Sequence, residues 1–255
     1  NIEKGSVVRA VPGVDCGSRA FADKMNSWAQ SQGAPGMGYI IFSDNEAKGP
    51  IANALGLEKS QILKEKFNLT DGDALFFSCA IEKEAADLAG KARTKIATEK
   101  KMIDENQFKF CWIVDYTMFE KNEITGEIDF SHNPFSMPQG GMKSLIEKNP
   151  LDILAYQYDL VCNGVELSSG AIRNHVPDIM YKAFEIAGHN HDVVDNKFPG
   201  MINAFKFGAP PHGGIAPGID RIVMLLADEP NLREIVLFPM TGKAEDLMMG
   251  APSEV

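Results

Sequence analysis

The sequence predicts an α+β protein, and three observations lead to this prediction. Short apolar stretches of strand character alternate with segments whose apolar residues recur at helical spacing. The pair Asn163-Gly164 separates two such stretches directly, which is typical of an antiparallel hairpin. The strand-like stretches also become longer after the charged stretch at residues 99–106, so we expect two domains, at residues 1–105 and 106–255. Antiparallel strands with intervening helices belong to the α+β class.

Residues 1–105 are expected to form a small α+β module. We expect strands at residues 6–11, 38–42 and 74–79, and helices beginning at residues 18, 57 and 82. In the first of these helices, Phe21, Met25 and Trp28 recur at helical spacing and would face a core. This half contains no histidine and no paired acids in an expected pocket. We therefore expect no catalytic chemistry from it.

The second half is expected to contain a buried strand, a hairpin and two helices. The expected elements are a strand at 110–116, a hairpin of 154–162 with 165–173, helices at 177–188 and 200–207, and a strand at 233–238. Pro177 favours a helix start, and Pro239 would stop the last strand.

Composition excludes several classes of protein. No apolar run approaches the roughly 20 residues that span a bilayer, so we expect no membrane segment. A net charge of −10 argues against coating nucleic acid by bulk charge. The four cysteines are scattered without metal-ligand spacing, which indicates reduced thiols in a cytoplasmic protein. The chain opens at Asn1 without a signal peptide, and we expect it to be part of a longer protein.

The hairpin places two carboxylates together. With Asn163-Gly164 as the turn, Val161 would pair with Glu166 and Asp159 with Ser168. Alternation then puts Asp159 and Glu166 on one face, where they could hold Mg²⁺ together with substrate phosphates. The alternative is a solvated polar face of an antiparallel sheet, which is the commoner use of such a pattern.

Arg173 lies seven residues beyond Glu166, an odd separation that would send the two side chains to opposite faces. Gly170 lies between them, and a glycine inside a strand often marks a bulge. A bulge at Gly170 would turn Arg173 onto the carboxylate face, where it could bind a carboxylate or phosphate bidentately. Without a bulge, Arg173 would be a surface or salt-bridged arginine.

A glycine-rich segment with an arginine suggests a nucleotide site near the C-terminus. Residues 213–218 contain three glycines, which let a ligand approach the backbone, and Arg221 would fall in the first turn of an apolar helix. A cation there is disfavoured by the helix dipole, so a ligand is one explanation for it. A loop that enters a core helix with a solvated arginine is the alternative. His132, in a loop with turn-forming residues, is a further candidate for a ligand contact or a structural role.

Together these segments resemble a known family. Gly214-Ile-Ala-Pro-Gly-Ile-Asp-Arg221 resembles motif 3 of the class II aminoacyl-tRNA synthetases. Asn163-Gly-Val-Glu-Leu-Ser-Ser-Gly-Ala-Ile-Arg173 is similar to the strand pair of the bacterial aspartyl-tRNA synthetases, and residues 130–135 and 207–214 fit the same family. Residues 1–105 resemble the GAD insertion domain of those enzymes. The resemblance implies part of an antiparallel-sheet catalytic domain with a GAD-type insertion domain.

The resemblance also implies a role for each candidate residue. Aspartate would be bound by Arg173, through its side-chain carboxylate, and by His132. ATP would be bound by Arg221 stacked on adenine, by Gly218, Ile219 and Asp220 along the nucleotide, and by Glu166, which with Asp159 would hold Mg²⁺. The implied reaction joins aspartate to AMP and then to tRNA(Asp), with tRNA(Asn) as a second acceptor left open. No covalent nucleophile is required, so no catalytic residue is assigned.

Two departures from the family pattern qualify these expectations. Many relatives carry two adjacent histidines where this chain has His132-Asn133. The anticodon-binding barrel, motif 1 and motif 2 are missing, so we expect a C-terminal fragment that is inactive by itself, from a parent enzyme that is a cytoplasmic homodimer. Two alternatives remain, a non-catalytic tRNA- or partner-binding module and a relative that adenylates another carboxylate. Joint retention of Glu166, Arg173 and Arg221 favours the ligase.

Overall fold

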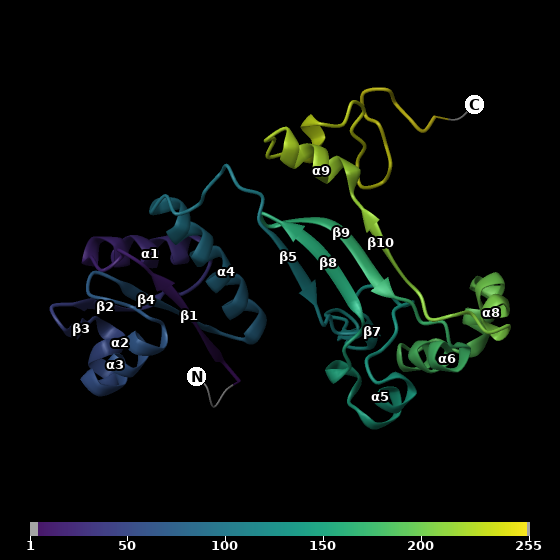
Figure 1. Cartoon of the computed structure of the whole chain (residues 1–255), viewed down its shortest axis with the longest axis horizontal. Coiled ribbons are helices and arrows are strands. Elements are labelled where there is room, and N and C mark those ends of the chain that lie inside the picture. Colours follow the sequence, from purple (N-terminus) through teal and green to yellow (C-terminus); the bar gives the residue numbers. More distant parts are fainter. Residues whose placement is uncertain (1–4, 254–255) are drawn as a thin grey trace. The chain divides into compact units, whose positions relative to one another are not determined.

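The computed structural model describes residues 5–253 and consists of two compact units, which meet in the chain at Gln107 and Phe108 (Figure 1). The domain boundary expected from the sequence lies two residues earlier, at 105. The assignment of the first unit as a GAD-type domain stays a prediction. Each unit is described by itself below.

The first unit is an antiparallel sheet with helices on both faces. Its elements are β1 Val7–Gly13, α1 Arg19–Ser31, β2 Gly38–Ser43, β3 Glu46–Lys48, α2 Pro50–Leu55, α3 Leu57–Lys66, β4 Ala74–Ala80 and α4 Glu82–Glu99. The strand order is β1-β4-β2-β3, and every paired neighbour is antiparallel. The helices predicted at residues 18, 57 and 82 are confirmed, and Ser18 caps α1 by accepting a hydrogen bond from the Phe21 backbone N–H at 3.2 Å.

Alternation along β4 divides the core of this unit between the two faces of the sheet. Phe76 packs with Met25 and other buried residues of α1 and α4, whereas the neighbouring Leu75 packs with Phe42 and residues of α2. Cys16 lies fully buried beside Phe76. Burial raises the pKa of the Cys16 thiol to about 11, because the thiolate would have to be desolvated.

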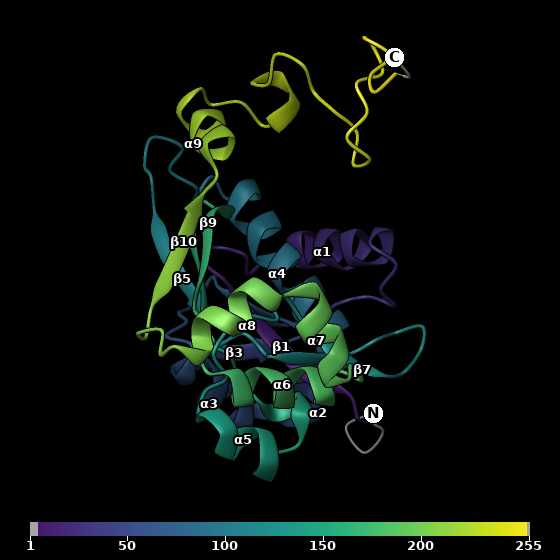
Figure 2. The same cartoon turned by 90° about the vertical axis from the view of Figure 1, so that its right-hand side faces the viewer.

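The second unit is built on another antiparallel sheet. Its elements are β5 Phe110–Val114, β6 Phe119–Lys121, β7 Ile128–Phe130, α5 Gly141–Glu147, a 3₁₀ turn at Pro150–Asp152, β8 Gln157–Cys162, β9 Val165–Ile172, α6 Pro177–Ile186, α7 His191–Lys197, α8 Pro199–Lys206, β10 Gly213–Pro217, α9 Ile219–Leu226 and a 3₁₀ turn at Leu232–Glu234. The strand order is β10-β9-β8-β5. Helices α6, α7 and α8 pack on one another near one end of the sheet, and α9 adjoins the other end (Figures 1 and 2).

The hairpin of β8 and β9 has the predicted turn but a different register. Asn163 and Gly164 adopt φ angles of 49° and 83°, as a type I′ turn requires, and Val161 pairs with Glu166 as predicted. The register then shifts by one residue, because Leu160 pairs with Ser168 and leaves Leu167 as an extra residue on β9. Asp159 consequently pairs with Ser169. The predicted pairing of Asp159 with Ser168 is wrong.

The bulge lies at Leu167, and the prediction of a bulge at Gly170 is wrong. Gly170 pairs regularly with Tyr158 on one side and with Ile215 on the other. A Cβ atom at Gly170 would overlap the Gly214 carbonyl oxygen and lie 2.5 Å from Cε2 of Tyr158. This glycine is therefore explained by the close approach of its neighbours.

Two strand predictions in this unit also need correction. β5 forms at the predicted place, but all five of its residues are exposed, since it is the edge strand of the sheet. The strand predicted at 233–238 does not form. A 3₁₀ turn occupies Leu232–Glu234, and no strand of the described chain pairs with the residues that follow it.

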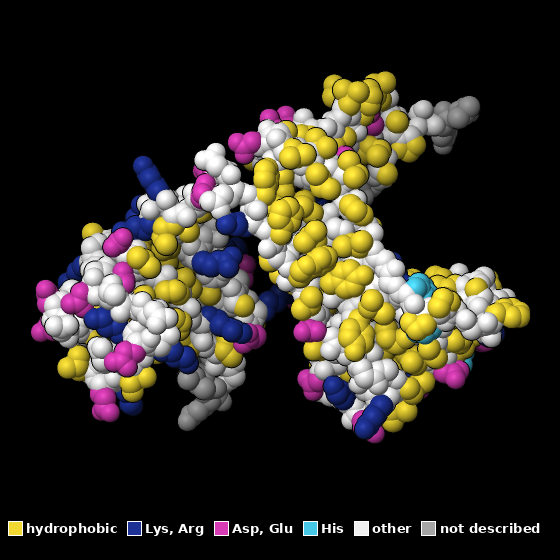
Figure 3. Space-filling model, viewed as in Figure 1, with side chains coloured by type: hydrophobic (Ala, Val, Ile, Leu, Met, Phe, Trp, Pro, Cys, Tyr) yellow, Lys and Arg dark blue, Asp and Glu magenta, His cyan; other side chains and the backbone are white. Residues whose placement is uncertain are grey.

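The exposed face of β5 belongs to a larger apolar surface. Figure 3 shows apolar side chains gathered over the second unit's sheet and α9. The exposed members include Phe110, Trp112, Val114, Ile215, Ile219 and Leu226.

Between residues 5 and 253, no helix has the length and apolar character needed to cross a membrane.

Candidate functional site

One face of the second unit's sheet is hollowed by a cavity of about 490 Å³. Two strands and two loops contribute its lining. The lining residues are Tyr116, His132, Asn133, Gln157, Asp159, Glu166, Ser169 and Gly170. Three residues predicted from the sequence, His132, Asp159 and Glu166, thus face one space.

Strand register explains why the two carboxylates share this face. Glu166 pairs with Val161, and Asp159 lies two residues along the same strand from Val161, so alternation points both acids to one side. The bulge at Leu167 then keeps Ser169, the partner of Asp159, on that side. The predicted placement of Asp159 and Glu166 on one face is confirmed.

Asp159 is held by a tyrosine from the chain that follows β5. The hydroxyl of Tyr116 donates a hydrogen bond to Oδ2 of Asp159. Burial raises the pKa of Tyr116 to about 12, helped by this hydrogen bond and by the negative charges of Asp159 and Glu166. Tyr116 therefore keeps its proton and acts as a donor at neutral pH.

The loop that carries His132 is fixed against the same strands. The His132 ring meets the Tyr116 ring edge-on, with centroids 5.0 Å apart and planes at 89°. Buried Gln157 donates from Nε2 to the Asn133 carbonyl oxygen at 3.2 Å, and Oδ1 of Asn133 accepts from the Phe135 backbone N–H at 2.9 Å. Asn133 therefore shapes the loop, and His132 is left exposed beside the cavity.

Helix α9 is anchored on the bulge of β9. The Gly218 backbone N–H donates to the Leu167 carbonyl oxygen at 2.7 Å, and Nη1 of Arg221 donates to the Glu166 carbonyl oxygen at 2.8 Å. The same Nη1 lies 3.0 Å from Oε1 of Glu166. Both side chains are a little under half exposed, at 43% and 45%, so solvent weakens this ion pair.

The remaining residues of the glycine segment lie beside this anchor. Residues 213–217, expected as a loop, form the edge strand β10, and Gly218 precedes α9 without a side-chain cap. Ile219 and Asp220 occupy the exposed first turn of α9, and Arg221 follows within that turn as predicted. The first turn of α9 thus lies beside Glu166. The unpaired backbone N–H groups at the start of a helix favour an anionic ligand.

Arg173 lies on the same side of the sheet but outside the cavity lining. Alternation from Ala171, which pairs with Gln157, places Arg173 on the carboxylate face, as the shifted bulge requires. Its Nη2 atom would lie 3.9 Å from a Cβ at Gly214, and its backbone N–H donates to the His212 carbonyl oxygen at 2.8 Å. Within residues 5–253, no carboxylate pairs with the half-buried Arg173 guanidinium.

The predicted metal ligands are few. No group of three or more His, Cys, Asp or Glu side chains is arranged for a metal ion within the described chain. Asp159 and Glu166 alone offer carboxylate oxygens to the cavity. Such a pair suits Mg²⁺ that arrives with substrate phosphates better than a cation held by protein alone.

Comparison with known proteins identifies the family. The family model described as tRNA synthetases class II (D, K and N) matches residues 40–242. The chain belongs to this family. The match begins within the first unit and includes every candidate residue of the second.

Curated relatives of this class II synthetase chain are named aspartate–tRNA(Asp/Asn) ligases. One from Zymomonas mobilis is 60% identical over 100% of the chain, and one from Gluconobacter oxydans is 57% identical over 98%. The chain spans 43% and 42% of the length of these two relatives. A solved aspartyl-tRNA synthetase from Entamoeba histolytica is 24% identical, with a TM-score of 0.39, over 61% of this chain and 27% of that one.

Sequence patterns did not indicate several residues of the candidate site. Tyr116, Gln157 and Ser169 line the cavity, but none had been singled out for a functional role. Tyr116 contacts an acid 43 positions away in the chain, so no local spacing could reveal it. For Gln157, the only available indication was a polar residue that alternates with Asp159 along the predicted strand.

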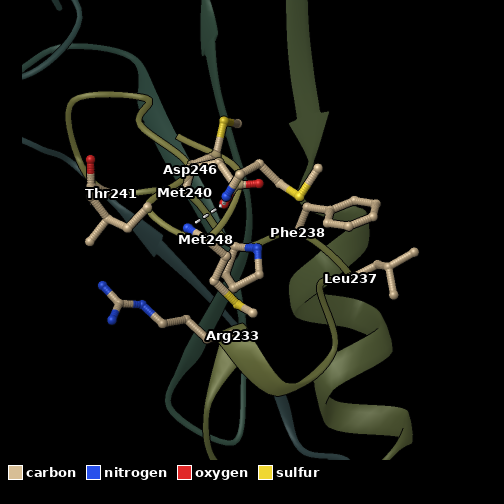
Figure 4. A pocket seen from close by; sticks show the side chains of 10 residues that line it. Arg233, Leu237, Phe238, Met240, Thr241, Asp246 and Met248 are labelled. Carbon is tan, nitrogen blue, oxygen red and sulfur yellow. Dashed lines mark hydrogen bonds between the residues drawn. The ribbon is translucent and has the colours of Figure 1, made fainter. Parts of the chain in front are cut away.

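A second cavity of about 210 Å³ lies in the C-terminal part of the synthetase chain (Figure 4). Most of its lining is apolar, including Leu237, Phe238, Met240 and Met248. Arg233 and Asp246 are the charged residues of this lining, and the sequence had indicated neither for chemistry. Two carboxylates and a histidine line the cavity at Asp159, and Arg221 contacts one of these carboxylates. We therefore take this cavity as the candidate site.

Proposed function

We propose that the protein containing this chain is an aspartate–tRNA ligase. It would activate L-aspartate with ATP and transfer the aspartyl group to tRNA. One observation carries the proposal. Asp159 and Glu166 face one cavity, and Arg221 is joined to Glu166 at the start of α9, so acidic and cationic groups for Mg·ATP lie together. The high identity to curated aspartate–tRNA(Asp/Asn) ligases supports it, and their names support both tRNAs as acceptors.

The nucleotide would bind between α9 and the two carboxylates. Arg221 would stack its guanidinium plane on adenine, and the backbone of Gly218, Ile219 and Asp220 would line the nucleotide. Asp159 and Glu166 would hold Mg²⁺ through oxygen atoms, which is the ligand type that this ion prefers. Bound there, Mg²⁺ supplies neutralisation of phosphate charge.

Aspartate would bind on the same face of the sheet. The Arg173 guanidinium lacks a carboxylate partner in the described chain and would pair with the side-chain carboxylate of the substrate. His132, exposed at the cavity, would contact the same amino acid. Asparagine would leave the arginine unpaired in a partly desolvated position, so the site should reject it strongly.

The reaction then follows from position and charge. An oxygen of the aspartate α-carboxylate attacks the α-phosphorus of ATP, and the bond to pyrophosphate breaks. A hydroxyl of the terminal tRNA ribose next attacks the acyl carbon, and AMP leaves. No protein nucleophile takes part, so this chain contributes by holding substrates in line and by stabilising phosphate charge. We further propose that the complete protein is a cytoplasmic homodimer.

Aspartate-dependent exchange of pyrophosphate into ATP tests the proposal. The protein expressed from its complete reading frame should catalyse exchange with aspartate and fail to do so with asparagine. Charging of purified tRNA(Asp) and tRNA(Asn) would then be compared in the same preparation. Exchange driven by asparagine alone, or no amino-acid-dependent exchange, would overturn the assignment.

A further inference from the structure

Tyr116 touches two of the groups that the proposed function uses. Its hydroxyl donates to Oδ2 of Asp159, and its ring edge meets the His132 ring at 5.0 Å between centroids. It lines the cavity between them and is half-buried. Asp115, just before it, adopts a left-handed φ of 60°, which marks the turn that carries Tyr116 out of β5.

The hydrogen bond from Tyr116 engages one oxygen of Asp159 and leaves the other available. Within the described chain, Oδ1 of Asp159 has no hydrogen-bond partner and the residue forms no ion pair. Glu166 shows the same division, because Oε1 faces Arg221 while Oε2 has no such partner among these residues. Each carboxylate therefore has one oxygen in contact with a protein side chain and one without a partner among the described residues.

From this geometry we infer that Tyr116 is a positioning residue for the Mg·ATP site. Its hydroxyl fixes the rotamer of Asp159 so that Oδ1 is presented to the cation, and its ring holds His132 at the neighbouring amino-acid position. The inference rests on the proposed function for its ligand, Mg·ATP. A carboxylate held in its binding orientation loses less rotamer freedom when the ligand arrives.

The two contacts of Tyr116 can be separated by substitution. Tyr116→Phe removes the hydroxyl and keeps the ring beside His132. Asp159 is then free to rotate, and loss of a hydrogen bond to a charged group corresponds to an effect of about tenfold or more. Tyr116→Leu removes both contacts. Only the second variant should disturb aspartate binding in addition.

Tyr181 provides a matched control in the same unit. Its hydroxyl donates to Oδ1 of Asp195 at 2.6 Å, and its ring stacks on His191 with centroids 4.5 Å apart. It thus makes the same kinds of contact at residues outside the cavity lining. Tyr181→Phe removes an equivalent hydroxyl while the candidate site stays intact.

The experiment uses the protein from the complete reading frame and measures metal–nucleotide binding as well as rate. Affinity for Mn·ATP is obtained by calorimetry, and exchange is followed against free Mg²⁺ and against aspartate. Tyr116→Phe should weaken Mn·ATP binding about tenfold and raise the Mg²⁺ needed for half-maximal exchange by a similar factor. Its KM for aspartate should stay within about twofold of the unmodified protein, whereas Tyr116→Leu should raise it severalfold.

The outcomes distinguish this inference from the proposed function. Equal Mn·ATP affinity in Tyr116→Phe and Tyr181→Phe would overturn the role of Tyr116, whatever the exchange rates. Absence of aspartate-dependent exchange in the unmodified protein would remove the proposed reaction, while the comparison of Mn·ATP affinities would still decide the role of Tyr116. Thermal unfolding of both variants serves as a check, because a fall in Tm confined to Tyr116→Phe with unchanged Mn·ATP affinity would make its role structural.

Discussion

Arg173 stands out at the scale of single residues because its charge has no counter-charge in the described chain. Half-buried arginines are normally paired, since an unpaired cation loses hydration without compensation. A substrate carboxylate would supply the missing partner. The planar guanidinium of Arg173 can form two parallel hydrogen bonds with that carboxylate, which a lysine ammonium cannot reproduce.

Arg173→Lys should therefore impair aspartate use while keeping the charge. We expect kcat/KM for aspartate in the exchange reaction to fall about 10- to 100-fold, with Mn·ATP affinity unchanged. Arg233→Lys, an exposed arginine in the lining of the C-terminal cavity, is the matched control. Equal aspartate kinetics for both variants would contradict the assigned role of Arg173.

Cys16 leads to a prediction about pH. Its pKa is raised to about 11 in the folded protein, above its ordinary value of 9.0, because the thiol is buried. The unfolded chain therefore loses this proton first. Stability is fully present below about pH 9 and decreases as the pH rises toward 11, by about 2–3 kcal/mol for this group.

This decrease can be measured through Trp28, which packs in the first unit. In a Trp112→Phe background, Trp28 fluorescence reports urea unfolding of that unit alone, since the chain has two tryptophans. Cys16→Ala should make the free energy of unfolding less dependent on pH between 9 and 11. Identical pH profiles with and without the thiol would contradict the prediction. Iodoacetamide should also modify exposed Cys79 well before Cys16.

At the scale of elements, the bulge in β9 decides the geometry of the site. It keeps Arg173 on the side of Asp159. Its carbonyl oxygens at Glu166 and Leu167 accept hydrogen bonds from Arg221 of α9 and from Gly218, which precedes α9. An ordinary strand would offer these carbonyl oxygens to a neighbouring strand instead. A one-residue irregularity thus links a helix to the sheet.

The sequence could predict the elements better than their register. Asn163-Gly164 and the alternation around it are local features, and they correctly indicated the turn and the shared face of Asp159 and Glu166. Leu167 has no local property that marks a bulge, because the bulge is supported by Gly218 and Arg221 from about fifty residues away. Tyr116 was missed for the same reason, since long-range contacts define its role.

Gly170→Ala tests the close approach of β9 and β10. The added methyl group would collide with the Gly214 carbonyl oxygen and the Tyr158 ring, so we expect a loss of about 1–3 kcal/mol or more in the stability of the second unit. Gly200→Ala in α8 meets no atom within 4 Å and should be neutral or stabilising. Urea unfolding monitored by Trp112 fluorescence in a Trp28→Phe background compares the two variants, and equal stability would contradict the close-packing explanation.

At the scale of the whole molecule, charge and apolar surface are unevenly divided. Residues 1–107 contain 14 Lys and Arg against 15 Asp and Glu, whereas residues 108–255 contain 11 against 20. The acidic second unit also carries the exposed apolar side chains of β5 and α9. Contiguous apolar surface of this kind is uncommon on proteins that remain monomeric.

The chain of 255 residues, expressed by itself, should therefore associate with itself. We expect its sedimentation coefficient to rise with concentration, and we expect binding of an apolar dye that the complete protein does not show. Trp112→Glu with Phe110→Glu should reduce both effects. We also expect no aspartate-dependent exchange from this chain alone. A dye-silent monomer at every concentration would contradict the prediction.

The double link between Arg221 and Glu166 has a consequence for how the site accepts a ligand. The bond to the Glu166 carbonyl oxygen does not depend on the charge of the carboxylate, whereas the contact with Oε1 does. Glu166 can therefore release Arg221 in favour of an incoming cation while α9 stays attached to β9. Because the N–H bonds of a guanidinium lie in its plane, neither contact of Nη1 covers the faces on which an aromatic ring would stack. An exchange of side-chain partners at Glu166 would therefore leave the backbone attachment of α9 to β9 in place.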